Sequence, residues 1–510
     1  MSSWLVLIAA LAAPLLYLLV ARQFSYWKRR GVAQLGPIFP FGNLGPFFRQ
    51  RSCLGVTYAE LYHRWKALPF VGIYFSLRPL LLINDPELIK NVLTRDFEYF
   101  HDRGLHVNEE KDPLSGHLFA LGGDKWRHHR SKLTPTFTSG RLKEMFQNLV
   151  EIGQVLQEYV GKRAAAGEEV DVRELMARYT TDVIASVGFG IENDSINDSD
   201  NMFRKMGTKV FAQDIKTIVR LASTFFLPKL NALFNFKFIA QDIEDFMMNV
   251  VRETLEYRES NNVVRKDIMQ LLMQLRNTGT VSMDKIWKVE AATPSAKQLS
   301  LEQVTAHAFV FFAAGYETSS STISFCLFEL ARNVDIQRKL QAEIDQVLAK
   351  HNGAITYDSI NEMKYLENCI DETLRKYPAV PFLNRECTKD YVIPGTSSTV
   401  EKGTTVIIPV LGLQHDPEFY SDPEKFIPER FTDEATTDKP YLPFGTGPRV
   451  CIGLRLGKLQ TKMGLVMMLS KFNIRLVDET YYSKELELDS KGLFLMPIGG
   501  IKVAVSARSD

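Results

Sequence analysis

The sequence has few cysteines and no paired cysteine motif. Its five cysteines among 510 residues are widely scattered, and no two form a Cys-x-x-Cys pair; they are Cys53, Cys326, Cys369, Cys387 and Cys451. This odd and dispersed set argues against a disulfide framework and against a structural zinc site. It suits a protein of a reducing compartment.

The sequence also lacks an excess of either charge. It carries 61 basic and 60 acidic residues, a net charge of +1. Nucleic-acid binding has no electrostatic support here, and we expect no nucleic-acid partner.

No Pro/Ser-rich or charged linker divides the interior. Although the length alone would allow about three domains, we expect a single catalytic body over residues 47–510.

The N-terminus has an uncharged apolar run, Trp4 to Ala21, just long enough to cross a bilayer. A cleaved signal peptide would require a basic region before the run, and residues 1–3 contain no side-chain cation. The cations follow instead, and the positive-inside rule then keeps the rest of the chain in the cytosol. We expect a signal anchor at residues 1–21, then a basic flank and a Pro/Gly hinge at residues 22–46.

Helical periodicity dominates the rest of the chain. The longest helical pattern runs from Leu301 to Asn333, and another runs from Ile452 to Leu469. Two β-rich runs, residues 70–75 and 79–84, precede Asp85, which we expect to cap a helix that has proline at its first position. The fold class expected is mainly α with a smaller β region (α+β).

One short stretch, Phe444-Gly-Thr-Gly-Pro-Arg-Val-Cys-Ile-Gly453, combines three glycines, a proline, an arginine and a cysteine. Its glycines let the backbone lie close to a flat ligand. Cys451 precedes a predicted helix, whose N-terminus should favour the thiolate that a haem iron needs as a ligand. A lone cysteine is more often a small buried hydrophobe. A dinucleotide loop is excluded because Val450 stands where a third glycine would be needed.

Three further patterns are ambiguous when taken alone. Trp126-Arg-His-His-Arg130 fits a surface helix, Ala313-Ala-Gly-Tyr-Glu-Thr318 fits a kinked helix, and Glu372-Thr-Leu-Arg375 fits an ordinary i,i+3 ion pair. Together with the cysteine loop and Pro428-Glu-Arg-Phe431, however, they resemble the motifs of the cytochrome P450 superfamily, the haem-thiolate monooxygenases, in order and spacing. The similarity is greatest to microsomal members of clan 3, which holds insect family 6 and the vertebrate broad-specificity drug oxidisers, and insect family 6 is the better match of the two.

The resemblance implies a fold with haem between a long central helix and the cysteine-bearing loop. It implies that Cys451 is the axial ligand of the iron of haem b, and that Thr318 and Glu317 are an acid–alcohol pair for oxygen activation, beside Ala314 and Gly315. The implied cofactor-binding residues are Trp126, Arg130, Arg385, Arg449 and Phe444. The implied structural network is Glu372, Arg375 and Arg430. Phe119 and Leu121 are expected in the roof of the substrate pocket.

The activity implied is insertion of one oxygen atom of O2 into lipophilic substrates. Since the sequence has no flavin or nicotinamide motif, NADPH electrons would come from a separate reductase, with cytochrome b5 as a second possible donor. We hypothesise a basic docking face made of Arg127, Lys132, Arg455 and Lys458. The expected location is the cytosolic face of the endoplasmic reticulum membrane, where residues 225–238 either enter the membrane interface or pack on the body.

Substrate identity stays open between xenobiotics, including synthetic insecticides, and endogenous molecules such as insect hormones, steroids or fatty acids. A haem-thiolate protein that is not an oxygenase is the third alternative. The Glu317-Thr318 pair argues against it, because only oxygen activation needs that pair.

Overall fold

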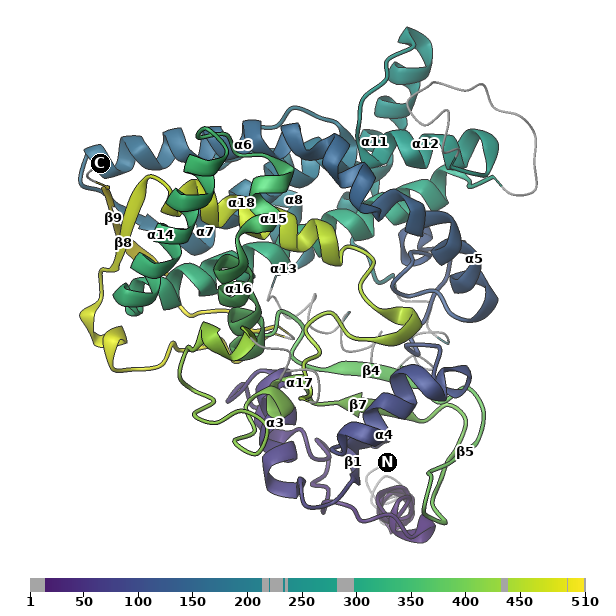
Figure 1. Ribbon diagram of the computed structural model, residues 1–510. Helices are drawn as coiled ribbons and strands as arrows, with labels where there is room; N and C mark the ends of the chain where they lie inside the picture. The colour runs from purple at the N-terminus through teal and green to yellow at the C-terminus, as the bar shows by residue number, and fades with distance from the viewer. Residues whose placement is uncertain are drawn as a thin grey trace, which may run out of the picture.

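The computed structural model describes residues 14–212, 220, 233, 237–281, 298–432, 439–492 and 494–508. Figure 1 shows a larger part built of helices and a smaller part around a four-stranded sheet. The helices are α2 (Gly45–Phe48), α3 (Leu54–Trp65), α4 (Pro86–Lys90), α5 (Gly123–Leu133), α6 (Ser139–Ala165), α7 (Val172–Ile184), α8 (Met202–Val210), α11 (Gln241–Asn261), α12 (Ile268–Thr278), α13 (Leu301–Arg332), α14 (Val334–Lys350), α15 (Tyr357–Glu362), α16 (Lys364–Lys376), α17 (Val410–Gln414) and α18 (Leu454–Leu469).

The strands form three small sheets. The largest has the order β1-β2-β7-β4, with β2 and β7 parallel and the other pairs antiparallel. A second sheet has the order β3-β9-β8, and β5 pairs with β6. The strands are β1 (Phe70–Phe75), β2 (Arg78–Ile83), β3 (Glu169–Asp171), β4 (Leu383–Glu386), β5 (Tyr391–Val392), β6 (Thr399–Val400), β7 (Thr405–Ile408), β8 (Phe472–Leu476) and β9 (Lys502–Ala507).

Helix α13 is the centre of the helical part. Ser300 starts it with a capping box, in which its side chain accepts from the Gln303 amide and the Gln303 side chain accepts from the Ser300 amide. Helix α7 packs along it, since Thr180 donates to the Tyr316 carbonyl at 3.0 Å and Ser324 donates to the Val172 carbonyl at 3.3 Å. The helix therefore spans the core with its position fixed by side-chain bonds to backbone groups of a neighbour.

Most of the expected elements are present. The predicted fold class is confirmed, and the predicted long helix is α13 (Leu301–Arg332). The predicted strands match β1 and β2, and Asp85 caps α4 by accepting from the Leu88 amide at 2.7 Å. The predicted start of one helix is wrong, because α18 begins at Leu454 and not at residue 452.

Much of the predicted membrane-associated sequence lies outside the described residues. Residues 1–13 of the expected anchor are not described; residues 14–24 are helical, with Leu15 to Leu19 exposed. In the part of the chain that the structure describes, no helix has the length and apolar character to span a bilayer. Of residues 225–238, only 233, 237 and 238 are described.

Candidate functional site

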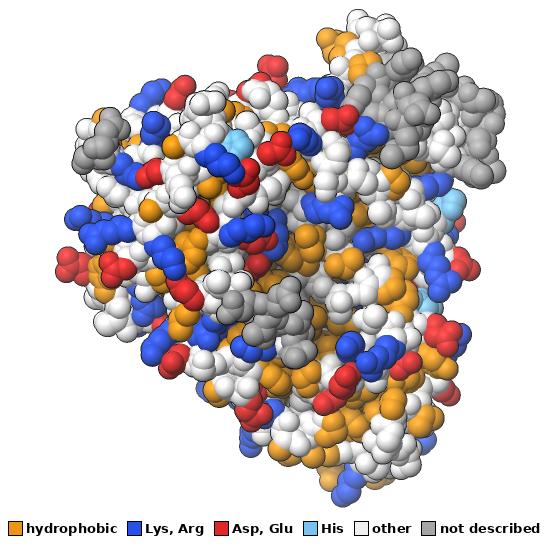
Figure 2. Space-filling view, in the orientation of Figure 1, with side chains coloured by type: hydrophobic (Ala, Val, Ile, Leu, Met, Phe, Trp, Pro, Cys, Tyr) orange, Lys and Arg blue, Asp and Glu red, His pale blue; other side chains and the backbone are white. Residues whose placement is uncertain are grey.

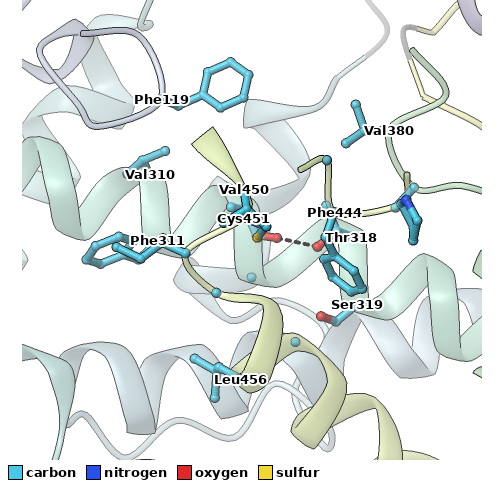
Figure 3. Close-up of a pocket in the computed structure, with 18 of the residues that line it drawn as sticks. Phe119, Val310, Phe311, Thr318, Ser319, Val380, Phe444, Val450, Cys451 and Leu456 are labelled. Carbon is cyan, nitrogen blue, oxygen red and sulfur yellow. Dashed lines mark hydrogen bonds between the residues drawn. The ribbon is translucent and has the colours of Figure 1, made fainter. Parts of the chain in front are cut away.

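A cavity lies between the helical part and the four-stranded sheet. Its lining is mainly apolar and comes from α13, α5, β4, the loop before α5 and the loop before α18. Figure 3 shows that Thr318 of α13 and Cys451 of the loop before α18 both line this cavity, together with Phe119, Val310 and Phe311. The structure therefore brings together motifs more than a hundred residues apart.

The loop before α18 is held by its own backbone. The Cys451 amide donates to the Phe444 carbonyl at 3.0 Å, which closes the loop on itself. Gly447 has φ of +72°, and a Cβ there would lie 2.1 Å from the backbone oxygen of Leu93. Only glycine fits at that position. At Gly453, in contrast, a Cβ would meet no atom within 4 Å, so that glycine leaves open space beside the cavity.

The environment of the Cys451 sulfur differs from the prediction. Cys451 lies three residues before α18, so it does not occupy the helix N-terminus. Its side chain is accessible because it faces the cavity, yet protein surrounds it on the other sides. Burial raises the pKa of the thiol, outweighing the Gly453 amide and the charges of Arg130 and Arg103. The protein's own groups therefore do not by themselves favour the thiolate, and a metal ion bound to the sulfur would.

On α13, Ala314, Gly315 and Thr318 line the cavity. The Thr318 hydroxyl donates to the Ala314 carbonyl at 2.7 Å, the bond drawn in Figure 3. The Gly315 carbonyl accepts a hydrogen bond from the side-chain amide of Gln460 in α18 at 2.9 Å. A Cβ at Gly315 would lie 2.4 Å from Ile184, so glycine allows α7 to approach α13 closely. The helix stays α-helical through this turn.

Glu317 points away from the cavity. It is only 4% exposed and does not line the cavity, unlike its neighbour Thr318. Its carboxylate forms an ion pair with Arg173 of α7 and accepts from Ser321 at 3.0 Å. The structure therefore separates the predicted acid–alcohol pair onto two sides of α13.

Four arginines gather at one edge of the cavity. Arg130 and Trp126 come from α5, Arg385 from β4, and Arg449 from the loop that carries Cys451. The fourth, Arg103, was missed by the sequence analysis, because nothing in the irregular region of residues 101–121 marks it out. Leu118, from the same irregular region, also lines the cavity.

These guanidinium groups are poorly compensated. Arg385 Nε and one terminal nitrogen of Arg449 are buried without a hydrogen-bond partner among the described residues. Burial lowers the pKa of Arg385 to about 10 and that of Arg449 to about 9, and the Arg385 charge contributes to the shift of Arg449. Because arginine stays protonated in proteins, the cluster has a free-energy cost that a bound anion removes.

This edge fits a haem. The carboxylate propionates of haem require donors and positive charge, and the four arginines with the Trp126 indole provide them. The Arg449 guanidinium lies 4.1 Å over the Trp126 ring and donates to the carbonyls of His101 and Leu121. Phe444 lines the flat cavity beside the loop glycines. The residues present therefore match a porphyrin with a sulfur ligand from Cys451.

The Glu372–Arg375–Arg430 set forms one network. Glu372 and Arg375 have no exposed side-chain surface; Arg375 Nε donates to Glu372 at 2.7 Å, and Arg430 Nε donates to it at 3.2 Å. Arg375 also donates to the Gln414 carbonyl at 2.9 Å, and Gln414 accepts from the Leu442 amide at 2.9 Å. The network thus reaches to within two residues of Phe444, where the cysteine loop begins.

Two lesser predictions need correction. Phe119 lines the cavity, but Leu121 is 2% exposed and contributes only its carbonyl, to Arg449. Lys458 is not an available surface cation, because its side chain is 21% exposed and pairs with Glu367 and Asp371.

The comparisons with known proteins agree with this geometry. A family model described as Cytochrome P450 matches residues 37–505. "Probable cytochrome P450 6d5" of Drosophila melanogaster is 41% identical over 502 residues, covering 98% of both chains. "Cytochrome P450 6d3" of Musca domestica is 40% identical, covering 97% of each chain, and "Cytochrome P450 6a2" of Drosophila melanogaster is 40% identical, covering 98% of each. The chain belongs to the cytochrome P450 family, among relatives of insect family 6.

Proposed function

We propose that this haem-thiolate monooxygenase oxidises lipophilic organic molecules in the cavity between Cys451 and Thr318. The observation that carries the proposal is the cavity itself: a sulfur side chain and a hydroxyl side chain face one apolar space, and four guanidinium groups lie at its edge. Family members use haem with electrons from NADPH through a reductase. When bound, the haem supplies the oxygen chemistry, and the protein supplies orientation, proton delivery and exclusion of water.

On one side of the cavity, Cys451 would hold the haem iron through its sulfur. Arg103, Arg130, Arg385 and Arg449, with Trp126, would hold the propionates, which would pair the buried donors of Arg385 and Arg449 and add to the ion pair that Arg449 forms with Asp102. The closed loop from Phe444 to Cys451 and the Glu372 network behind it keep the sulfur in one position.

On the other side, Thr318 is the hydroxyl that would lie beside the oxygen chemistry of a bound haem. Its bond to the Ala314 carbonyl orients the hydroxyl, with an oxygen lone pair left to accept from water in the cavity. Glu317 lies on the far side of α13, where its carboxylate pairs with Arg173 and accepts from Ser321. To relay a proton, the carboxylate would have to leave Arg173, take up a proton from solvent and then pass it to the cavity side of the helix, where Ala314 carries only a methyl group.

The substrate is apolar. The described lining away from the arginine edge consists mainly of aliphatic and aromatic side chains, including Phe137, Val310, Phe311 and Val380. Such a lining offers area for burial but few polar groups to select one orientation. Breakdown of xenobiotics, including synthetic insecticides, fits this lining better than the alternative, a dedicated steroid, hormone or fatty-acid hydroxylase.

The electron donor is a separate NADPH-dependent reductase, with cytochrome b5 as a second donor. Its proposed docking face now consists of Arg127, Lys132 and Arg455, since Lys458 is neutralised by two carboxylates. Arg127 and Arg455 are exposed. Figure 2 shows basic and acidic side chains interspersed over one face of the molecule, so docking depends on local groups rather than on the net charge.

We place the protein at the endoplasmic reticulum membrane, with the body on the cytosolic face. The segment after the apolar N-terminus is attached firmly: Trp27 is fully buried and donates to the Ile73 carbonyl at 3.2 Å, and Arg30 pairs with Glu401 at 2.5 Å. A body tied to its N-terminal segment in this way has a restricted orientation at the membrane.

The test is oxygen incorporation. Purified protein with reductase and NADPH, under isotopically labelled dioxygen, should place one labelled oxygen atom in a lipophilic product. A haem-loaded protein that oxidises none of a broad panel of lipophilic compounds would favour the non-oxygenase alternative. Preference for a steroid or fatty acid over all xenobiotics would favour the dedicated hydroxylase.

A further inference from the structure

Two histidines from different helices form a buried hydrogen bond beside the cavity. His129 Nδ1 of α5 lies 2.7 Å from His307 Nε2 of α13, and the ring centroids are 4.9 Å apart. His129 is 5% exposed and His307 is fully buried. Neither ring lines the cavity, so the pair is not part of the site described above.

The pair joins the two helices on which that site depends. His129 directly precedes Arg130 and is three residues after Trp126, so α5 carries the pair and the propionate donors within one turn. On α13, His307 is eleven residues before Thr318, with Phe311 and Ala314 at the intermediate i+4 and i+7 positions of the same face.

In the hydrogen bond between the two neutral rings, one ring nitrogen donates its proton and the other accepts it, so the direction depends on the tautomers. His307 Nδ1 is buried and has no partner among the described residues. If His129 donated, His307 would carry an unpaired N–H at that atom. The less costly assignment has His307 Nε2–H donating to His129 Nδ1, which leaves a lone pair at His307 Nδ1. A buried donor left unpaired costs more than a buried acceptor.

We propose that His129 and His307 are a positioning pair that sets the spacing between the propionate-binding residues of α5 and the oxygen-side face of α13. The inference rests on the proposed roles of Trp126, Arg130 and Thr318. It adds that the distance between those groups is fixed by a side-chain hydrogen bond and not by helix packing alone.

The surroundings keep the pair uncharged. Burial, with the positive charges of His128, Lys132 and Lys125 outweighing Glu109, lowers the pKa of His129 to about 4. Burial, His129, His117 and Lys132 hold the pKa of His307 well below its usual value. The pKa of His117, in the irregular region before α5, is itself lowered to about 4 by burial and by the charge of Arg103. For histidines with depressed pKa values, stability is present above about pH 6.5 and is lost as the pH falls toward 4.

The first experiment is a double-mutant cycle on the haem-loaded protein. His129→Phe and His307→Phe should each speed haem transfer to apomyoglobin about three- to tenfold, the factor for one buried hydrogen bond. The double variant should transfer haem no faster than the faster of the two single variants. His307→Gln, which can still donate a hydrogen bond, should transfer haem at nearly the wild-type rate. His63→Phe, at an exposed histidine of α3, is the matched control and should change nothing. Additive effects, or unchanged haem transfer, would overturn the proposal.

A second experiment does not depend on the phenylalanine variants folding. The double variant His129→Gln, His307→Gln keeps a possible hydrogen bond but cannot titrate, so its acid-induced loss of haem should begin at lower pH than in the wild type. An identical pH profile would contradict the pair's role. A wild-type protein without a thiolate-type carbon-monoxide spectrum would instead contradict the proposed function, which separates the two failures.

Discussion

The cysteine loop and the arginine edge, which we propose bind the same haem, are built in different ways. The loop from Phe444 to Cys451 is contiguous, closed by its own backbone hydrogen bond and supported from behind by Glu372 and Arg375. The edge is assembled from four separate segments, with donors left unpaired at Arg385 and Arg449. The loop is thus held by contacts within the protein, whereas the edge has buried donors that an anion would pair.

The largest change should come from removing the ligand at the centre of the loop. Cys451→Ser should abolish both the thiolate-type carbon-monoxide spectrum and all product formation, because a hydroxyl cannot replace the thiolate on iron. Cys53→Ser is the matched control, since Cys53 is buried away from the cavity at 1% exposure. An unchanged spectrum in the Cys451 variant would place the axial ligand elsewhere.

Breaking the ion-pair network behind the loop should have a smaller effect than loss of Cys451, but it should lower the free energy of unfolding more than any substitution at the arginine edge. Arg375→Met leaves Glu372 as a buried, partly unpaired charge, and the free energy of unfolding should fall by about 3–5 kcal/mol. Denaturant titration measures this. Arg338→Met removes an arginine that is 74% exposed in its pair with Asp335, and should change the free energy by less than about 0.5 kcal/mol. Equal effects would mean that burial does not decide the network's importance.

Substitution at the edge should act on haem retention and leave folding intact. Arg103→Gln and Arg385→Gln should each raise the haem dissociation rate about 10- to 100-fold, the value of one hydrogen bond to a charged group. The unfolding free energy without haem should stay unchanged or rise for Arg385→Gln, which removes a buried charge that has no ion-pair partner among the described residues. It should change little for Arg103→Gln, because Arg103 is partly exposed and donates to the Phe119 carbonyl. Arg455→Gln, on the exposed surface, is the control. Edge variants that unfold without haem would remove the distinction between the two regions.

Thr318 lies across the cavity, so changing it should leave loop and edge as they are. Thr318→Ala should keep the haem and its spectrum, while the share of consumed NADPH recovered as product falls roughly tenfold and peroxide rises, since the hydroxyl that holds a proton-delivering water in the cavity is lost. Thr318→Ser keeps the hydroxyl and should recover much of the coupling. Unchanged coupling in the alanine variant would remove Thr318 from the proton path.

The same contrast explains what the sequence could predict. The cysteine loop, α13 and the cap at Asp85 are local patterns, in which turn residues, helical periodicity and capping act within a few positions of one another. The resemblance to a known family added the pairing of Glu372 with Arg430, which no local signal contains.

The parts that were missed depend on contacts between distant segments. Arg103 reaches the edge only through the path of an irregular loop, and Lys458 is neutralised by two acids of α16. The pKa of Cys451 depends on burial by the whole cavity more than on the helix that follows it. The His129–His307 bond joins residues 178 positions apart, a separation at which single-sequence patterns carry no information.

The central claim is that a sulfur atom of this chain binds the iron directly. The carbon-monoxide difference spectrum of the purified wild-type protein after reduction tests it most directly. The account predicts the red-shifted absorption band typical of a thiolate ligand, at one haem per chain. A band typical of a histidine ligand, or a protein that binds no porphyrin, would contradict it.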